Sequence, residues 1–247
     1  MRRFGSMFAL LALLLTGCDS SSAEEDGEAF ITVSFQSPDY SAGKTGGMPI
    51  TGSNGVLNID HMAFVVSEFE LRADGDGCFF GRLDEDCHEF DVDPRLVTFN
   101  MDGNAVPIAS EKVPAGTYRA IEFEIEDLDL DDGGLSASLR NNVRAQYPDW
   151  PDEASLLVTG TFTSTGGVQR PFRSYFEADV EVERVFATPV NVAESEALYI
   201  RVDPGPWFRE DNQTVVDLSL YDYTTTGEVA DLDVEIEDGL SEVEIDD

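Results

Sequence analysis

The chain has 247 residues, of which 50 are Asp or Glu and 15 are Lys or Arg, giving a formal net charge of −35. This charge repels nucleic acid and anionic lipid headgroups, which argues against both as partners of the folded surface. Hydrophobic residues make up 42% of the chain, enough for a globular core rather than a disordered polymer.

The first 17 residues have the pattern of a secretory signal peptide. Arg2 and Arg3 form a positive start, and residues 8–15 form an apolar run. That run is too short to cross a bilayer, which needs about 20 apolar residues. We therefore predict that residues 1–17 are removed and take no part in the fold.

The signal ends in Leu15-Thr16-Gly17-Cys18, which resembles the lipobox of bacterial lipoproteins. The resemblance implies cleavage before Cys18 and acylation of that cysteine. It therefore places the protein in the bacterial cell envelope, held to a lipid bilayer by acyl chains. Two or more chains anchor stably, whereas one anchors weakly. The sequence does not choose between the periplasmic face of the inner or outer membrane and the cell surface.

Residues 18–28 are polar and acidic, and we expect a disordered tether there. The body follows at residues 29–230 and shows no break in composition, so one sandwich, or two closely packed ones, is preferred over two linked domains. Residues 231–247 read as an acidic tail that holds one edge strand at residues 232–236 and then frays.

Alternation between apolar and polar residues dominates the body and predicts strands with one face in a core and one in water. The predicted strands are residues 29–36, 58–72, 78–83, 96–101, 118–126, 155–163, 168–175, 176–183, 198–203 and 216–221. Turns rich in Gly, Pro, Asn and Asp separate them. We therefore predict an all-β, antiparallel sandwich or barrel.

Two segments depart from simple alternation. Leu139 and Val143 continue a four-residue apolar repeat between Gly134 and Pro148, which predicts one short helix over residues 135–147. Residues 58–72 are long for a single strand, and their inward-facing set shifts along the segment. The shift predicts a β-bulge or bend near Ser67.

The run Val113-Pro-Ala-Gly-Thr-Tyr118 resembles a turn of Ig-like and transthyretin-like bacterial sandwiches. The layout, with the later Asp203-Pro-Gly-Pro-Trp-Phe208, also resembles uncharacterised envelope lipoproteins. The resemblance implies an Ig-like or transthyretin-like β-sandwich over most of residues 30–222, with Gly116 in a conformation that other residues avoid. It implies no activity.

Three cysteines are present, and Cys18 is assigned to lipid. In an oxidising envelope, Cys78 and Cys87 are expected to form a disulfide, worth about 2.5–3 kcal/mol in the chain-entropy model. The alternative is a metal site that uses both cysteines and His88.

Calcium is the one cofactor that the sequence suggests. Acidic side chains alternate ahead of glycines in residues 127–133, as at the start of an EF-hand loop, although the EF-hand Gly and bidentate Glu positions are filled differently. A non-EF-hand site would use Asp127, Asp129, Asp131 and Asp132. The alternative is a solvated acidic surface, since excess acid with only two lysines resembles proteins of salt-loving bacteria.

Aromatic residues beside prolines form another candidate site. Tyr147, Trp150 and Trp207 are expected in loops, where exposed rings could stack on a sugar. The other interpretation, which we favour, is that the rings plug the ends of the sandwich.

No catalytic signature emerges from the sequence. A nucleophilic triad could draw only on His61 and His88 as its histidine, and no Gly-x-Ser-x-Gly elbow is present. Pairs of carboxylates, which glycoside hydrolysis requires, are inevitable among 50 acids and carry no information.

The sequence thus favours a non-catalytic envelope module that binds a protein or glycan or has a structural role. The alternatives are a Ca²⁺-dependent adhesion or glycan-binding domain and, below it, a carboxylate-based glycoside hydrolase. Neither a nucleic-acid partner nor a defined oligomeric state is predicted.

Overall fold

The computed structural model describes residues 28–37, 47–73, 94–125, 137–177, 180–192, 195–210, 212–231 and 240–246. Its central element is β3 (Gly55–Ala73), a strand of 19 residues. In chain order its sheet partners are β2 (Met48–Gly52), β4 (Arg95–Asn100), β6 (Gly116–Ile125) and β7 (Leu156–Ser164). The pairing register of β3 with β6 shifts between Val66 and Glu68, so the bulge predicted near Ser67 is confirmed.

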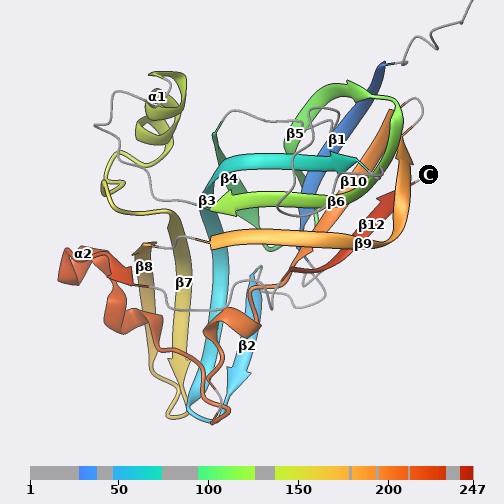
Figure 1. The fold of residues 1–247 in the computed structure, drawn as a ribbon. Coiled ribbons are helices and arrows are strands. Elements are labelled where there is room, and N and C mark those ends of the chain that lie inside the picture. The colour runs from blue at the N-terminus through green and yellow to red at the C-terminus, as the bar shows by residue number, and fades with distance from the viewer. Residues whose placement is uncertain are drawn as a thin grey trace, which may run out of the picture.

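The large sheet has eight strands among the described residues and runs in the order β11-β8-β7-β3-β6-β9, with β2 and β4 also paired to β3 (Figure 1). Its remaining members are β8 (Gln169–Glu177), β9 (Val180–Val192) and β11 (Ala230–Asp231). The alternating run at 176–183 was predicted as one strand. That prediction was wrong, because β8 ends at Glu177 and β9 begins at Val180.

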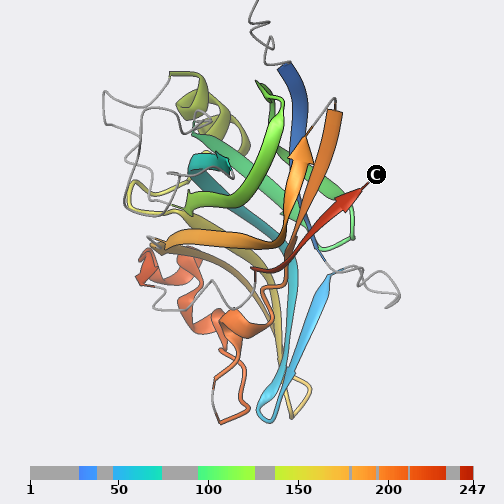
Figure 2. The same cartoon turned by 45° about the vertical axis from the view of Figure 1, so that its right-hand side comes forward.

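The small sheet has four strands in the order β12-β10-β1-β5 and faces the large one as the second layer of a sandwich (Figure 2). Its members are β1 (Glu28–Gln36), β5 (Ala105–Pro114), β10 (Ser195–Val202) and β12 (Leu240–Asp246). The pairing of β1 with β10 is parallel, as is that of β8 with β11. The sandwich is therefore mainly, but not wholly, antiparallel.

The predicted acidic tail takes part in the small sheet. Strand β12 pairs antiparallel with β10, placing Val243 opposite Ile200 and Ile245 opposite Leu198. The edge strand thus lies at residues 240–246, later than predicted, and residues 232–236 lie outside the described part of the chain.

Alternating residues of both sheets fill the space between them. Ile31, Val33 and Phe35 of β1 are fully buried. The Phe35 ring contacts Phe64 of β3 and Phe123 of β6, with centroids 5.5 and 5.2 Å away. Each such side chain contributes about 1.5–3 kcal/mol when removed from water. The strand predicted at residues 29–36 therefore has one face in the core.

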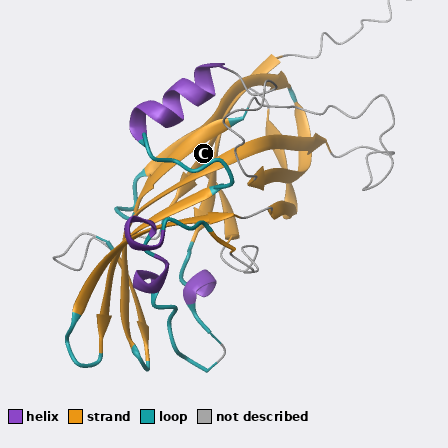
Figure 3. Ribbon diagram, turned by 90° about the vertical axis from the view of Figure 1, so that its left-hand side faces the viewer, coloured by secondary structure: helices purple, strands orange, loops and turns teal. Residues whose placement is uncertain are grey.

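A short helix covers the outer face of the large sheet (Figure 3). Helix α1 (Ala137–Gln146) buries Leu139 and Val143, the residues whose spacing predicted it. They pack in a second cluster with Ala63 and Val65 of β3. This cover explains why both faces of β3 are apolar between residues 62 and 66.

The last part of the described body is helical rather than extended. It contains the 3₁₀ helices η1 (Pro206–Phe208) and η2 (Leu218–Tyr221) and the single-turn helix α2 (Tyr223–Thr226). The strand predicted at residues 216–221 was therefore wrong. Asp217 accepts a hydrogen bond from the Ser219 backbone N–H and so caps η2, and Leu220 is 68% exposed rather than inward-facing.

The turn at residues 113–118 carries the chain from one sheet to the other, because β5 ends at Pro114 and β6 begins at Gly116. Gly116 does not have a positive φ, and a Cβ atom built on it would meet nothing within 4 Å. The expectation of a special backbone conformation at Gly116 was therefore wrong.

Among the described residues, no helix is long and apolar enough to cross a membrane.

Candidate functional site

Three chain segments meet at the end of the sandwich opposite the start of β1 (Figures 1 and 2). They are the β2–β3 turn with Ser53 and Asn54, the β7–β8 turn at residues 165–168, and the segment 209–217, in which residue 211 is not described. We call this the three-loop end. Loops at the ends of a rigid sandwich are where such folds place ligand contacts.

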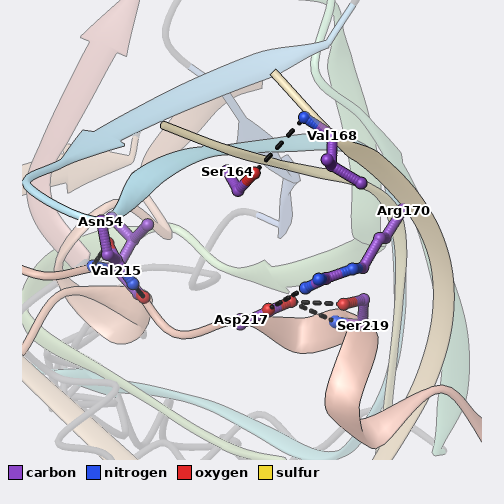
Figure 4. Close-up of polar contacts among 7 residues, drawn as sticks. All are labelled: Asn54, Ser164, Val168, Arg170, Val215, Asp217 and Ser219. Carbon is purple, nitrogen blue, oxygen red and sulfur yellow. Dashed lines mark hydrogen bonds and ion pairs between the residues drawn. The ribbon is translucent and has the colours of Figure 1, made fainter. Parts of the chain in front are cut away.

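Asn54 holds these three segments together. Its Nδ2 donates to the Val215 carbonyl oxygen at 2.8 Å, and the Val215 N–H donates to its Oδ1 at 2.9 Å (Figure 4). The Asn54 carbonyl oxygen accepts from the Thr165 N–H at 3.2 Å. A carboxamide pairs with a peptide group as another peptide would, so the side chain extends the hydrogen bonding across a separation of 161 residues.

Further backbone contacts tie segment 209–217 to the β2–β3 hairpin. The Ser53 N–H donates to the Gln213 carbonyl oxygen at 2.9 Å, and Arg209 Nη1 donates to the Thr51 carbonyl oxygen at 3.1 Å. A Cβ atom at Gly52 would lie 2.6 Å from the Val215 backbone nitrogen. Glycine at position 52 therefore permits the close approach of the two segments.

Replacing Asn54 by alanine is expected to lower the free energy of unfolding by about 1–3 kcal/mol, because two hydrogen bonds to Val215 are lost in a partly buried site. Urea denaturation measures the loss, and hydrogen exchange of the Val215 amide measures the loosening. Asn104→Ala is the matched control, since Asn104 is exposed and, within the described ranges, its side chain bonds Asp102 of its own turn. Equal effects of the two substitutions would contradict the bridging role of Asn54.

Beside this bridge, β8 is linked to η2. Arg170 Nη1 lies 3.1 Å from Asp217 Oδ2, and Asp217 Oδ1 accepts from the Ser219 N–H and hydroxyl (Figure 4). The Ser164 hydroxyl oxygen accepts from the Val168 N–H at 3.3 Å. An exposed ion pair of this kind adds little to the stability of the fold. Its effect is to hold η2 in place beside β8.

Apolar side chains are exposed around this link. Val168 in the β7–β8 turn is 54% exposed, and Leu220 and Tyr221 of η2 are 68% and 44% exposed. Single exposed apolar residues are normal on a protein surface. These three apolar side chains, however, lie beside segments whose backbones are held by hydrogen bonds. A surface that is already ordered loses less conformational entropy when it binds a partner.

The aromatic residues predicted as ligand platforms lie elsewhere. Trp207 is 3% exposed and packs between the sheets against Phe208, and Trp150 is 5% exposed and packs beneath α1. This burial leaves neither indole ring open for stacking on a sugar, and both plug the fold instead. Tyr147 is half-buried, and its hydroxyl lies 2.7 Å from His61 Nε2.

The rings beneath α1 form one continuous row. Ring centroids are 6.1 Å apart for His61 and Tyr147, 5.6 Å for Tyr147 and Trp150, 5.4 Å for Trp150 and Tyr175, and 5.1 Å for Tyr175 and Tyr223. Trp150 Nε1 donates to the Ala154 carbonyl oxygen at 2.9 Å. His61 therefore belongs to a packed, hydrogen-bonded layer.

Polar groups close one side of this row. Arg173 Nη2 donates to Asp149 Oδ1 at 2.7 Å and to the Tyr175 hydroxyl at 2.6 Å, and its guanidinium carbon lies 5.4 Å from the Tyr175 ring centroid. Burial raises the pKa of Tyr175 far above its ordinary value, against the lowering effect of Arg173. The phenol thus stays protonated at any physiological pH.

A second charged group lies on the outer face near the end of β3. Arg72 contacts both Glu70, at 3.5 Å, and Glu122, which lie opposite each other in the β3–β6 register. Glu183 of β9 is opposite Glu122. One guanidinium therefore offsets part of the repulsion within a cross-strand row of carboxylates.

The remaining predicted site residues lie outside the described part of the chain. They are Cys18, Cys78, Cys87, His88, Asp127, Asp129, Asp131 and Asp132. Among the described residues, no group of three or more His, Cys, Asp or Glu side chains is placed to hold a metal ion. The acylation, disulfide and Ca²⁺ interpretations therefore stay predictions.

The fold and these contacts define the chain as a two-sheet β-sandwich protein with one fixed loop end. No protein-family model matches the sequence, and no curated protein matches it. Among solved structures, the chain is similar to MbnP from Methylosinus trichosporium, with 11% sequence identity and a TM-score of 0.36. The similarity covers 71% of this chain and 76% of that one.

Proposed function

We propose that the protein is an envelope lipoprotein, acylated at Cys18, whose sandwich acts as a non-catalytic binding or structural module. Its ligand is a protein or a glycan, and the contact surface is the three-loop end. The observation that carries this proposal is the Asn54 bridge, which joins loops from distant parts of the sequence into one fixed surface.

The position of that end supports the assignment. The predicted tether precedes β1 in the sequence, and the three-loop end lies at the opposite end of the molecule from the start of β1 (Figure 2). A protein held at Cys18 would therefore present these loops away from the membrane. Fixed loops with exposed apolar side chains lose less conformational entropy on binding than mobile ones.

The binding surface is tested by photo-crosslinking in intact cells. A benzophenone amino acid at Val168 is expected to give a discrete crosslinked product, because the position lies in the three-loop end. Val185 on β9 is the matched control, since it is also a valine and is 55% exposed, against 54% for Val168. Benzophenone inserts into C–H bonds, so it captures protein and sugar alike.

A crosslink at position 168 that is absent at position 185, and that weakens with Asn54→Ala, is the expected result. Equal products from both positions, or products from neither, would overturn the assignment of the three-loop end. Anchoring is tested separately by labelling with radioactive palmitate. Label on the wild type that disappears with Cys18→Ser is expected, and label retained by that variant would contradict acylation at Cys18.

A further inference from the structure

Segment 209–217 contains an acceptor pattern for N-linked sugar. Asn212-Gln213-Thr214 is the only Asn-x-Ser/Thr triplet in the 247 residues, and its middle residue is not proline. Asn212 and Gln213 are exposed, and Thr214 is half-buried. A glycan requires such a surface position, because the transferring enzyme must reach the asparagine.

The backbone presents this triplet on a tight turn. Arg209 and Val215 form an antiparallel bridge, and the Glu210 N–H donates to the Thr214 carbonyl oxygen at 3.0 Å. Gln213 adopts a φ of +66°, a left-handed conformation uncommon for a residue with a Cβ. The turn is thus held on both sides, and its Gln213 carbonyl is bonded by Ser53 of the neighbouring hairpin.

Within the turn, Thr214 acts on the oxygen of the Asn212 carboxamide. The Thr214 N–H donates to Oδ1 at 2.8 Å, and the Thr214 hydroxyl lies 2.6 Å from the same oxygen. The hydroxyl also contacts Glu210 Oε2, so its single hydrogen is shared between two acceptors. Donors on Oδ1 draw electron density from the carboxamide and make the Nδ2 hydrogens more acidic. Nδ2 itself makes no hydrogen bond to any residue in the described ranges.

From this arrangement we infer that Asn212 is a site of N-linked glycosylation by an oligosaccharyl transferase. The co-substrate is an oligosaccharide linked to a polyprenyl diphosphate. Asn212 Nδ2 forms a bond to C1 of the first sugar as the bond between C1 and the diphosphate oxygen breaks. The polyprenyl diphosphate leaves with the bonding electron pair, and one Nδ2 hydrogen departs as a proton to a base of the transferase.

The inference requires export, which is part of the proposed function, but it does not require a ligand at the three-loop end. The glycan would stand on the edge of that end formed by segment 209–217. The β7–β8 hairpin, with Val168 and Arg170, lies next to this segment, because Arg170 contacts Asp217 at 3.1 Å. Modification at Asn212 would therefore add a polar sugar to the three-loop end itself, on the segment that carries Val215 and Asp217.

The test uses the full-length chain in a bacterial host that carries an oligosaccharyl transferase, its lipid-linked oligosaccharide and a known acceptor protein. Intact-protein mass spectrometry is expected to show the mass of one oligosaccharide. Asn212→Gln and Thr214→Val should abolish the added mass, whereas Thr214→Ser, which keeps the hydroxyl, should retain it at lower occupancy. Thermal melting confirms that each variant is folded.

A second version of the protein carries an established export leader in place of residues 1–17. It tests glycosylation without depending on whether residues 1–17 act as a signal peptide. If that protein gains no sugar while the known acceptor is modified, the glycosylation inference is overturned. It is also overturned if the sugar persists in Asn212→Gln. Loss of residues 1–17 from the native chain is read from the same spectra, so a failure of its own leader is recognised independently.

Discussion

Replacing Gly160 by alanine is expected to lower the free energy of unfolding by about 3 kcal/mol, the upper end of the cost of overpacking. A Cβ atom at position 160 would lie far inside van der Waals contact with the Asn58 carbonyl oxygen and 3.0 Å from Phe172 Cζ. The obstacle is backbone, which cannot rotate away as a side chain can. Urea denaturation with an unchanged m-value measures the loss.

Gly116→Ala is the control for this substitution. A Cβ atom there meets nothing within 4 Å, and Gly116 does not have a positive φ. We expect a change within about 0.5 kcal/mol of the wild type. A large loss at Gly116 together with a small one at Gly160 would contradict the packing of β7 against β3 described above.

The second large effect is expected at Trp150. Alanine at this position removes a buried indole beneath α1, which should cost about 3–5 kcal/mol. Phenylalanine keeps much of the packing but leaves the Ala154 carbonyl oxygen without the indole N–H, at a cost of about 1–3 kcal/mol. Thermal or urea unfolding should therefore rank the wild type above Trp150→Phe and that variant above Trp150→Ala.

The same series tests the rejected idea of Trp150 as a sugar platform. An exposed platform residue can be replaced with little loss of stability, because its ring is already in water. Tryptophan fluorescence should also resist quenching by acrylamide, since Trp150 and Trp207 are both buried. An unchanged unfolding curve for Trp150→Ala would refute the buried position.

Strand positions followed from the sequence wherever burial alternated cleanly. In β6, Ile121, Phe123 and Ile125 are buried while the glutamates between them are only partly covered, as expected. The bulge at Ser67 was predictable because it inverts which residues face inward, and that inversion is visible in the order of apolar residues. Helix α1 was predictable from a four-residue repeat bounded by Gly134 and Pro148.

Other elements could not be predicted from the alternation of apolar and polar residues. Residues 216–221 alternate like a strand, but the side chain of Asp217 bonds the Ser219 backbone and turns the chain into a 3₁₀ helix. Strand β5 was not predicted, since Pro107 and Pro114 interrupt its pattern. Prolines are tolerated there because β5 is at the edge of the small sheet.

The three-loop end could not be assembled from the sequence. Asn54 stands in a Ser-Asn-Gly turn, and local rules assign it only to that turn. Its bonds to Val215 depend on where the chain returns 161 residues later. The Asn212 triplet was visible in the sequence, but its exposure and its contacts with Thr214 were not.

The position of β1 has a consequence for how the chain reaches its folded state. This first strand lies between β5 and β10, and β10 in turn pairs with β12 at residues 240–246. Pairings between such distant residues give a high contact order, which is typical of folding in milliseconds to seconds rather than microseconds. A chain released N-terminus first therefore holds β1 without its parallel neighbour until β10, at residues 195–202, has emerged.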